Sequence, residues 1–242
     1  MLLPELRAAV AAANREIARA GLVILSFGNA SGVDRGAGAM VIKASGLPCA
    51  TLQPEETVVV ALADGRVIDG AFRPSSDTPT HLLLYRRFSA LGGIVHTHSP
   101  QATAWAQAGH PIPCLGTTHA DYFHGPVPVT RRLTRAEIEG EYELKTGEAI
   151  AEACLAGGDD PLEVPAALVH SHGPFAWGGD PAEAAENAIA VEAVADMALS
   201  TTRIEAGVER IDDALLERHF WRKHGAGATY GQSGPGNRPP HD

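Results

Sequence analysis

Two apolar segments that each end in a His-x-His pair place the strongest constraint on how this chain can fold. His96 and His98 close the first segment, and His170 and His172 close the second. Side chains two residues apart on a strand point to the same face, so each segment can present two imidazoles together. Because the pairs are far apart in the sequence, a shared site requires a fold that brings two strand ends together.

Imidazoles that meet in this way are suited to a divalent cation. A set of three histidines is a known zinc-binding set, and it leaves one coordination position open for substrate. The alternative is that each pair is hydrogen-bonded at the end of its strand, but the repetition of the pattern favours a shared metal. Spacing alone leaves open whether His170 or His172 turns toward that metal.

Periodicity predicts strands and helices that alternate along most of the chain. The expected helices cover residues 4–20, 78–88, 100–108, 134–157, 180–202 and 212–224, and the expected strands cover 22–26, 40–43, 57–62, 66–68, 93–98 and 166–170. The pattern predicts one α/β domain over residues 1–231. Its expected architecture has three layers, a mixed and largely antiparallel central sheet with helices on both faces. Residues 232–242 are poor in apolar side chains and are expected to be disordered.

Charge and composition exclude several classes of protein. The formal net charge is −10 without a run of Lys or Arg, which argues against nucleic acid as a partner. No apolar run approaches the ~20 residues of a membrane span, and the N-terminus does not have the form of a signal peptide. Three widely spaced cysteines argue against a disulfide framework. The expectation is a cytoplasmic protein without a membrane partner, in which local groups must hold any anionic substrate.

Small polar segments supply candidates for such local groups. Residues 27–32 and 42–46 each follow a β-like run, and either could be an ordinary turn. Together with Ser75 and Ser76 they could form a phosphate cradle of N–H, amide and hydroxyl donors, with Lys43 nearby. Asp77 has two interpretations, as a cap of the helix near Pro79 or as a group that joins or orients the metal shell.

Two further segments carry ionisable groups. His119 and Asp121 lie in an expected loop, where they could serve catalysis or only fix the loop by hydrogen bonds. Arg222, Lys223 and His224 are interpreted as charges that complement the C-terminus of the last helix.

Eight motifs together make the sequence resemble a known family. They are GNASGVDR, VIKASG, PSSDTPTH, GGIVHTHS, GTTHADYF, GEYE, LVHSHGPFAWG and KHGAGATYGQ, and they span nearly the whole chain up to Gln232. In this order they resemble the ketopentose-phosphate 4-epimerases of the class II aldolase/adducin family. The proline-rich tail and Pro48-Cys49 depart from the family pattern without touching a matched functional residue.

The resemblance implies a set of functional residues and an assembly. It implies zinc, with Mn²⁺ or Co²⁺ as possible substitutes, at His96, His98 and His172, with Asp77 in or near the shell. The implied acid/base pair is Asp121 and Tyr230, and the implied assembly is a homotetramer with active sites at subunit interfaces. The implied phosphate-binding residues are Gly28, Asn29, Ser45, Gly46, Ser75 and Ser76, with Lys43 and Thr117 nearby.

The implied reaction interconverts L-ribulose 5-phosphate and D-xylulose 5-phosphate by breaking and remaking the C3–C4 bond. Related aldolases have a glutamate at the position of Asp77, so the aspartate favours the epimerase branch. Two alternatives stay open: a class II aldolase that releases its products, and a non-catalytic adducin-like interaction domain.

Overall fold

The computed structural model describes residues 1–157, 160–225 and 228. Its strands are β1 (Gly28–Asp34), β2 (Ala39–Lys43), β3 (Thr57–Ala61), β4 (Val67–Asp69), β5 (Gly93–Thr97), β6 (Ala166–Val169) and β7 (Gly173–Gly178). Its α-helices are α1 (Pro4–Arg19), α2 (Thr78–Arg87), α3 (Pro100–Ala108), α4 (Thr117–Ala120), α5 (Arg135–Glu139), α6 (Tyr142–Gly157), α7 (Pro181–Ile204) and α8 (Asp213–His224). Short 3₁₀ turns cover Cys49–Thr51 and Pro54–Glu56. None of the helices in these ranges is long and apolar enough to cross a membrane.

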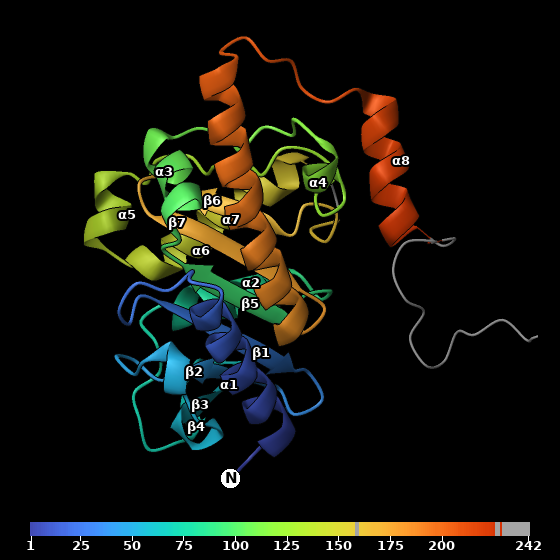
Figure 1. The fold of residues 1–242 in the computed structure, drawn as a ribbon. Coiled ribbons are helices and arrows are strands. Elements are labelled where there is room, and N and C mark those ends of the chain that lie inside the picture. The colour runs from blue at the N-terminus through green and yellow to red at the C-terminus, as the bar shows by residue number, and fades with distance from the viewer. Residues whose placement is uncertain (158–159, 226–227, 229–242) are drawn as a thin grey trace, which may run out of the picture.

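The seven strands form one sheet in the order β4-β3-β2-β1-β5-β7-β6, and each neighbouring pair is antiparallel. The expected single α/β domain with a layered sheet is confirmed, and its sheet is antiparallel throughout these pairs. β5, which carries the first His-x-His pair, lies between β1 and β7 near the middle of the sheet (Figure 1).

Helices cover both faces of the sheet, and strand alternation decides which side chains each face receives. α1, α3 and α7 pack on one face, where Val95 is buried, and α2 and α6 pack on the other, where Ile94 is buried. His96 alternates with Val95 and therefore falls on the α2 and α6 face, against Phe175 of β7. Figure 1 shows α8 beside α4 at one side of the molecule, and Leu216 of α8 packs in an apolar cluster with Ala120 of α4.

The prediction for the segment before β2 was wrong. Residues 22–26 were expected to be a strand and 27–32 a turn, but the strand is β1, Gly28–Asp34. The reason is close packing on a central strand. A Cβ on Gly32 would lie 2.7 Å from Leu6 Cδ1 and 2.8 Å from Pro181 Cγ, so the first residues of α1 and α7 require small residues there. Small residues give no apolar periodicity, and the strand signal is lost.

The prediction of one helix over 134–157 was also wrong in part. Thr134 and Glu137 form the expected capping box, but α5 ends at Glu139 because Gly140 adopts a ψ of −121°, which no helix accommodates. A new helix, α6, begins at Tyr142. The strand β7 was not predicted, since Gly173 and Pro174 at its start are weak strand formers.

Candidate metal centre and substrate cavity

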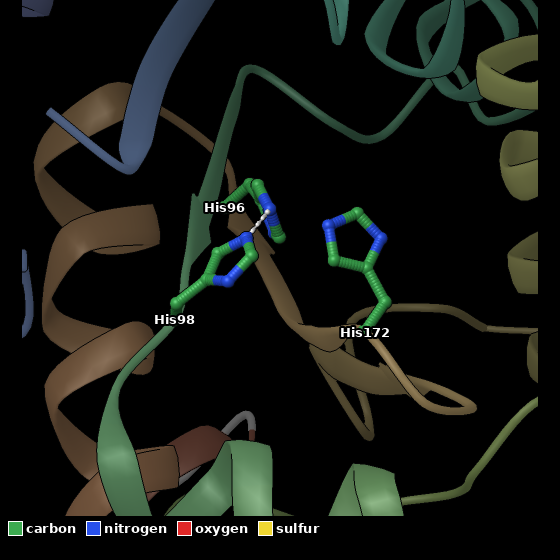
Figure 2. A group of neighbouring side chains, drawn as sticks. All are labelled: His96, His98 and His172. Carbon is green, nitrogen blue, oxygen red and sulfur yellow. Dashed lines mark hydrogen bonds between the residues drawn. The ribbon is translucent and has the colours of Figure 1, made fainter.

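Three imidazoles converge at one end of the central strands. His96 lies on β5, His98 follows that strand, and His172 lies in the turn between β6 and β7. The ring nitrogens available for ligation lie within 4.8 Å of one another. Figure 2 shows the rings facing a common space. The fold thus brings together the two His-x-His segments, as the repeated pattern predicted, and it is His172 that joins the first pair.

The hydrogen bonds around His96 identify its free lone pair. His96 Nδ1 lies 2.9 Å from the Pro174 carbonyl oxygen, which can only accept, so Nδ1 carries the proton. Nε2 of His96 therefore has its lone pair directed to the other rings, and Nε2 of His98 lies 3.1 Å away. Two such nitrogens need a proton or a cation between them, and the set fits a divalent cation.

Burial favours the neutral form of two of these imidazoles, His98 and His172. Burial, with help from His96 and His98, lowers the pKa of His172 to about 3. Burial and the neighbouring His96 also lower the pKa of His98. Neutral imidazole is the form that donates a lone pair to a metal ion, so the environment favours ligation at neutral pH.

Asp77 occupies the N-cap position of α2, yet its carboxylate makes no capping hydrogen bond. It accepts a hydrogen bond of 2.6 Å from Asn29 Nδ2 instead. Burial raises the pKa of the Asp77 carboxyl, but His96, His81 and the Asn29 amide lower it by more, and the net shift is downward. The interpretation of Asp77 as a helix cap is therefore wrong, and a carboxylate anion lies beside the histidines.

A cavity of about 380 Å³ opens over these groups. Its lining contains the three histidines, Asp77, residues of both polar segments (27–32 and 42–46) and five further residues. The lining residues are Ser26, Phe27, Gly28, Asn29, Lys43, Ser45, Gly46, Ser75, Ser76, Asp77, His96, His98, Tyr142, Glu143 and His172. Of the residues expected to bind metal or phosphate, Thr117 alone is missing from this wall.

Backbone pairing joins the polar segments of the cavity. Ser45 N donates to the Arg73 carbonyl at 2.9 Å, and Ser75 N donates to the Lys43 carbonyl at 3.0 Å. Asn29 Nδ2 also donates to Ser75 Oγ at 3.1 Å. The wall therefore offers hydroxyl and amide donors from three segments at one place, which is a suitable environment for a phosphate group.

Lys43 adds a cation to this wall. Its side chain is buried, and burial lowers the pKa of its ammonium group, while Cys49 and Asp77 partly offset that effect. Its amino group donates to the Ala44 carbonyl at 3.2 Å. A buried ammonium at the edge of a polar cavity is well suited to an anionic ligand.

The expected acid/base group lies elsewhere in the chain. Asp121 follows α4, and its carboxylate accepts hydrogen bonds of 3.0 Å from His219 Nδ1 and of 3.0 and 3.2 Å from Arg222 Nη2, both on α8. Neither Asp121 nor Thr117 contributes to the cavity wall. Tyr230, the expected partner of Asp121, lies outside the described residues.

Several residues of the cavity and of the surroundings of Asp121 were not predicted from the sequence. Tyr142 and Glu143 line the cavity, and the Tyr142 hydroxyl lies 3.2 Å from His172 Nδ1. The GEYE motif was a signal for them, but the prediction of an unbroken helix concealed it. Arg222, interpreted as a charge for a helix end, binds Asp121, and His219 was not considered.

Comparison with known proteins finds similar sequences over nearly the whole chain. The model of the class II aldolase and adducin N-terminal domain matches residues 8–199. Proteins named L-ribulose-5-phosphate 4-epimerase UlaF, from Salmonella paratyphi A and Salmonella typhi, are each 51% identical over 230 residues. Each match covers 95% of this chain and 100% of the relative.

Solved structures share the fold. An L-fuculose 1-phosphate aldolase superposes with a TM-score of 0.74 at 21% identity, covering 89% of this chain and 94% of that chain, a likeness of fold alone. The L-fuculose-1-phosphate aldolase of Thermus thermophilus reaches a TM-score of 0.65 at 27% identity, over 85% of this chain and 98% of that chain.

Proposed function

Because this chain belongs to the class II aldolase and adducin family, we propose that it is an L-ribulose-5-phosphate 4-epimerase that interconverts L-ribulose 5-phosphate and D-xylulose 5-phosphate. The observation that carries the proposal is one cavity in which three facing imidazoles adjoin a wall of anion-binding donors. A ketose phosphate needs both parts, and relatives of that name match the chain over 95% of its length.

The cation is proposed to be Zn²⁺, with Mn²⁺ or Co²⁺ as substitutes, held by His96, His98 and His172, with Asp77 in or near its shell. When bound, it supplies positive charge beside the ketose oxygens on which negative charge develops. His96 is already ordered for this purpose by its bond to the Pro174 carbonyl, and Asp77 by its bond to Asn29.

The proposed reaction follows from the position of the carbon that inverts. That carbon is C4, and its hydrogen is not on a carbon adjacent to the C2 carbonyl. The C4 hydroxyl, however, is β to that carbonyl, so removal of the hydroxyl proton permits cleavage of the C3–C4 bond. The fragments are the enediolate of dihydroxyacetone and glycolaldehyde phosphate. If the aldehyde turns while its phosphate stays bound, re-addition to its opposite face inverts C4.

The groups that would hold this phosphate line the cavity wall. They are Gly28, Asn29, Lys43, Ser45, Gly46, Ser75 and Ser76. Apart from Lys43, their donors come from the backbone and short side chains, which lose little conformational freedom on binding. A phosphate held in this way keeps the aldehyde fragment in place between cleavage and re-addition.

Two acid/base groups are needed, one for each face of the aldehyde, and Asp121 and Tyr230 are proposed for them. His219 and Arg222 hold the Asp121 carboxylate in place. Because Asp121 and Thr117 do not reach the cavity of their own chain, we propose a homotetramer in which a neighbouring copy supplies Thr117, Asp121 and Tyr230.

An exposed apolar loop supports such a contact. Phe27, which lines the cavity, exposes 51% of its surface, and its sequence neighbours Ile24 and Leu25 expose 47% and 81%. Apolar groups gathered in this way beside a polar site are typical of a surface that another protein covers. The domain that assembles is proposed to span residues 1–231, with 232–242 as a tail outside it.

The test is to incubate the zinc-loaded protein with L-ribulose 5-phosphate and follow both pentulose phosphates and glycolaldehyde phosphate. The proposal predicts conversion to D-xylulose 5-phosphate without accumulation of the two-carbon phosphate. Accumulation of glycolaldehyde phosphate would contradict it in favour of an aldolase. Stoichiometric cation binding without turnover of any ketose phosphate would favour an adducin-like binding domain.

A further inference from the structure

The first histidine of the second His-x-His pair does not join the cluster, and its contacts indicate another role. We infer that His170 is a positioning residue, which holds Ser171 in a left-handed backbone conformation and thereby turns His172 toward His96 and His98. The inference concerns the cation site of the proposed function and therefore rests on it.

The conformation of Ser171 explains why the two histidines of this pair diverge. On a regular strand, residues 170 and 172 would point to the same side. Ser171 has a φ of +61°, in a region that residues other than glycine rarely adopt. Residues 170–172 form the turn between β6 and β7, and of these three Ser171 has the positive φ. Across this turn His172 faces the cluster, while His170 faces Arg132.

A directed chain of hydrogen bonds ends on Ser171. Arg132 Nε lies 3.1 Å from His170 Nε2, and because a guanidinium can only donate, Nε2 of His170 is the acceptor. The proton of the neutral ring is then on Nδ1, which donates to Ser171 Oγ at 2.8 Å. His170 thus holds the side chain of the residue in this turn whose backbone is in the left-handed conformation.

Helix α3 provides the surface on which this turn rests. Ser171 N donates to the Ala106 carbonyl at 2.9 Å. A Cβ on Gly109, the residue that ends α3, would lie 2.5 Å from His170 Nε2, so the imidazole fits only against a glycine. The same helix begins at Pro100, two residues after His98. α3 therefore links the two His-x-His segments, and His170 is the contact that fixes their positions relative to each other.

The test measures cation affinity rather than turnover. Metal-depleted full-length protein is titrated with Co²⁺, whose visible absorption reports a low-coordinate histidine site. We expect His170→Ala to bind Co²⁺ about 10–100-fold more weakly, the usual effect of removing a group that orients a ligand. We expect Ser171→Gly to bind as the wild type does, because glycine adopts positive φ without support. The double variant His170→Ala/Ser171→Gly should then recover most of the lost affinity.

Matched controls separate positioning from general damage. His110→Ala removes an exposed histidine next to Gly109 and should leave the affinity unchanged. Thermal unfolding of each metal-free variant reports whether the fold persists. If His170→Ala does not fold, Arg132→Ala removes only the exposed end of the same chain of bonds and should weaken Co²⁺ binding in the same direction.

Two results would overturn the inference alone: unchanged affinity in a folded His170→Ala protein, or no recovery in the double variant. If the wild-type protein itself bound no Co²⁺, the proposed cation site would fail, and the inference with it.

Discussion

The proton of His96 resides on Nδ1 because a backbone carbonyl accepts it, and this bond directs the Nε2 lone pair to the neighbouring rings. Sequence spacing predicted that His96 and His98 share a face, since that follows from strand alternation alone. It did not decide between His170 and His172, because that choice depends on the φ of Ser171, which no local pattern encodes. The histidine side chains therefore supply the ligand nitrogens, and the backbone conformation decides which histidine faces the cluster.

Replacement of His98 and of Asp121 should separate cation binding from proton transfer. His98→Asn removes a ring nitrogen from the cluster, so we expect loss of the bound cation and of epimerisation. Asp121→Asn leaves the cluster intact, so we expect full cation content and a turnover reduced by roughly 10²–10⁴-fold, the range for a lost general acid or base. Metal analysis and initial rates on both variants are the measurements. A His98→Asn protein that retained cation and activity would show that the cluster is wrongly assigned.

His119 should make the stability of the metal-free protein depend on acid pH. Burial lowers its pKa to about 4, and a hydrogen bond from its Nε2 to the Gly125 carbonyl offsets this only partly. The folded state therefore prefers neutral His119, and the unfolded chain takes up a proton near pH 6.5. This stabilisation is present above pH 6.5 and is lost as the pH falls toward 4, by about 3 kcal/mol at pH 4.

Urea unfolding between pH 7 and pH 4 tests this dependence. His119→Gln can still donate to the Gly125 carbonyl but does not titrate, so its stability should fall less steeply with acid than that of the wild type. Parallel pH profiles of the two proteins would show that His119 does not contribute.

At the scale of elements, helices and strands with a clear hydrophobic periodicity or a terminal signal were predicted from the sequence. Elements shaped by tertiary packing were missed. α1, α3 and α7 were predicted nearly to the residue, since each begins at a proline. α1 also has an apolar stripe, and α7 has Asp180 as its N-cap. β1 was missed because helices pack directly on its backbone, and the start of α6 was missed because a helix period does not reveal the break at Gly140. Both omissions fall beside the cavity.

Gly32 on β1 offers a test of that packing. Gly32→Ala places a methyl group within 2.8 Å of both Leu6 and Pro181, so we expect a loss of about 1–3 kcal/mol in the free energy of unfolding. Gly36→Ala, in the exposed β1–β2 turn, is the control and should change it by less than about 0.5 kcal/mol. Equal effects of the two substitutions in urea unfolding would contradict the packing argument.

At the scale of the whole molecule, the proposed chemistry is divided between two places in one chain. The three histidines and the anion-binding wall lie in one cavity, while Asp121 is bound to α8 and does not line it. The sequence motifs indicated both the histidine cavity and Asp121. No local pattern, however, says whether these two groups meet within one chain or between chains. That relation depends on the assembly, which composition and periodicity do not report.

Mixing two inactive variants tests whether sites form between subunits. His98→Asn and Asp121→Asn tetramers, dissociated and reassembled together, should regain activity, because some interfaces then combine an intact cluster with an intact Asp121. Random assortment would restore roughly a quarter of the sites. Recovery that is absent after verified subunit exchange would show that each chain builds its own site.

The proposed cation site is tested most directly by the anomalous scattering of crystals of the full chain grown with zinc, recorded at the zinc absorption edge. We expect one strong peak per chain, about 2.0–2.1 Å from a ring nitrogen of each of His96, His98 and His172. A peak elsewhere, or no peak among these three rings in protein that is otherwise folded and zinc-saturated, would contradict it.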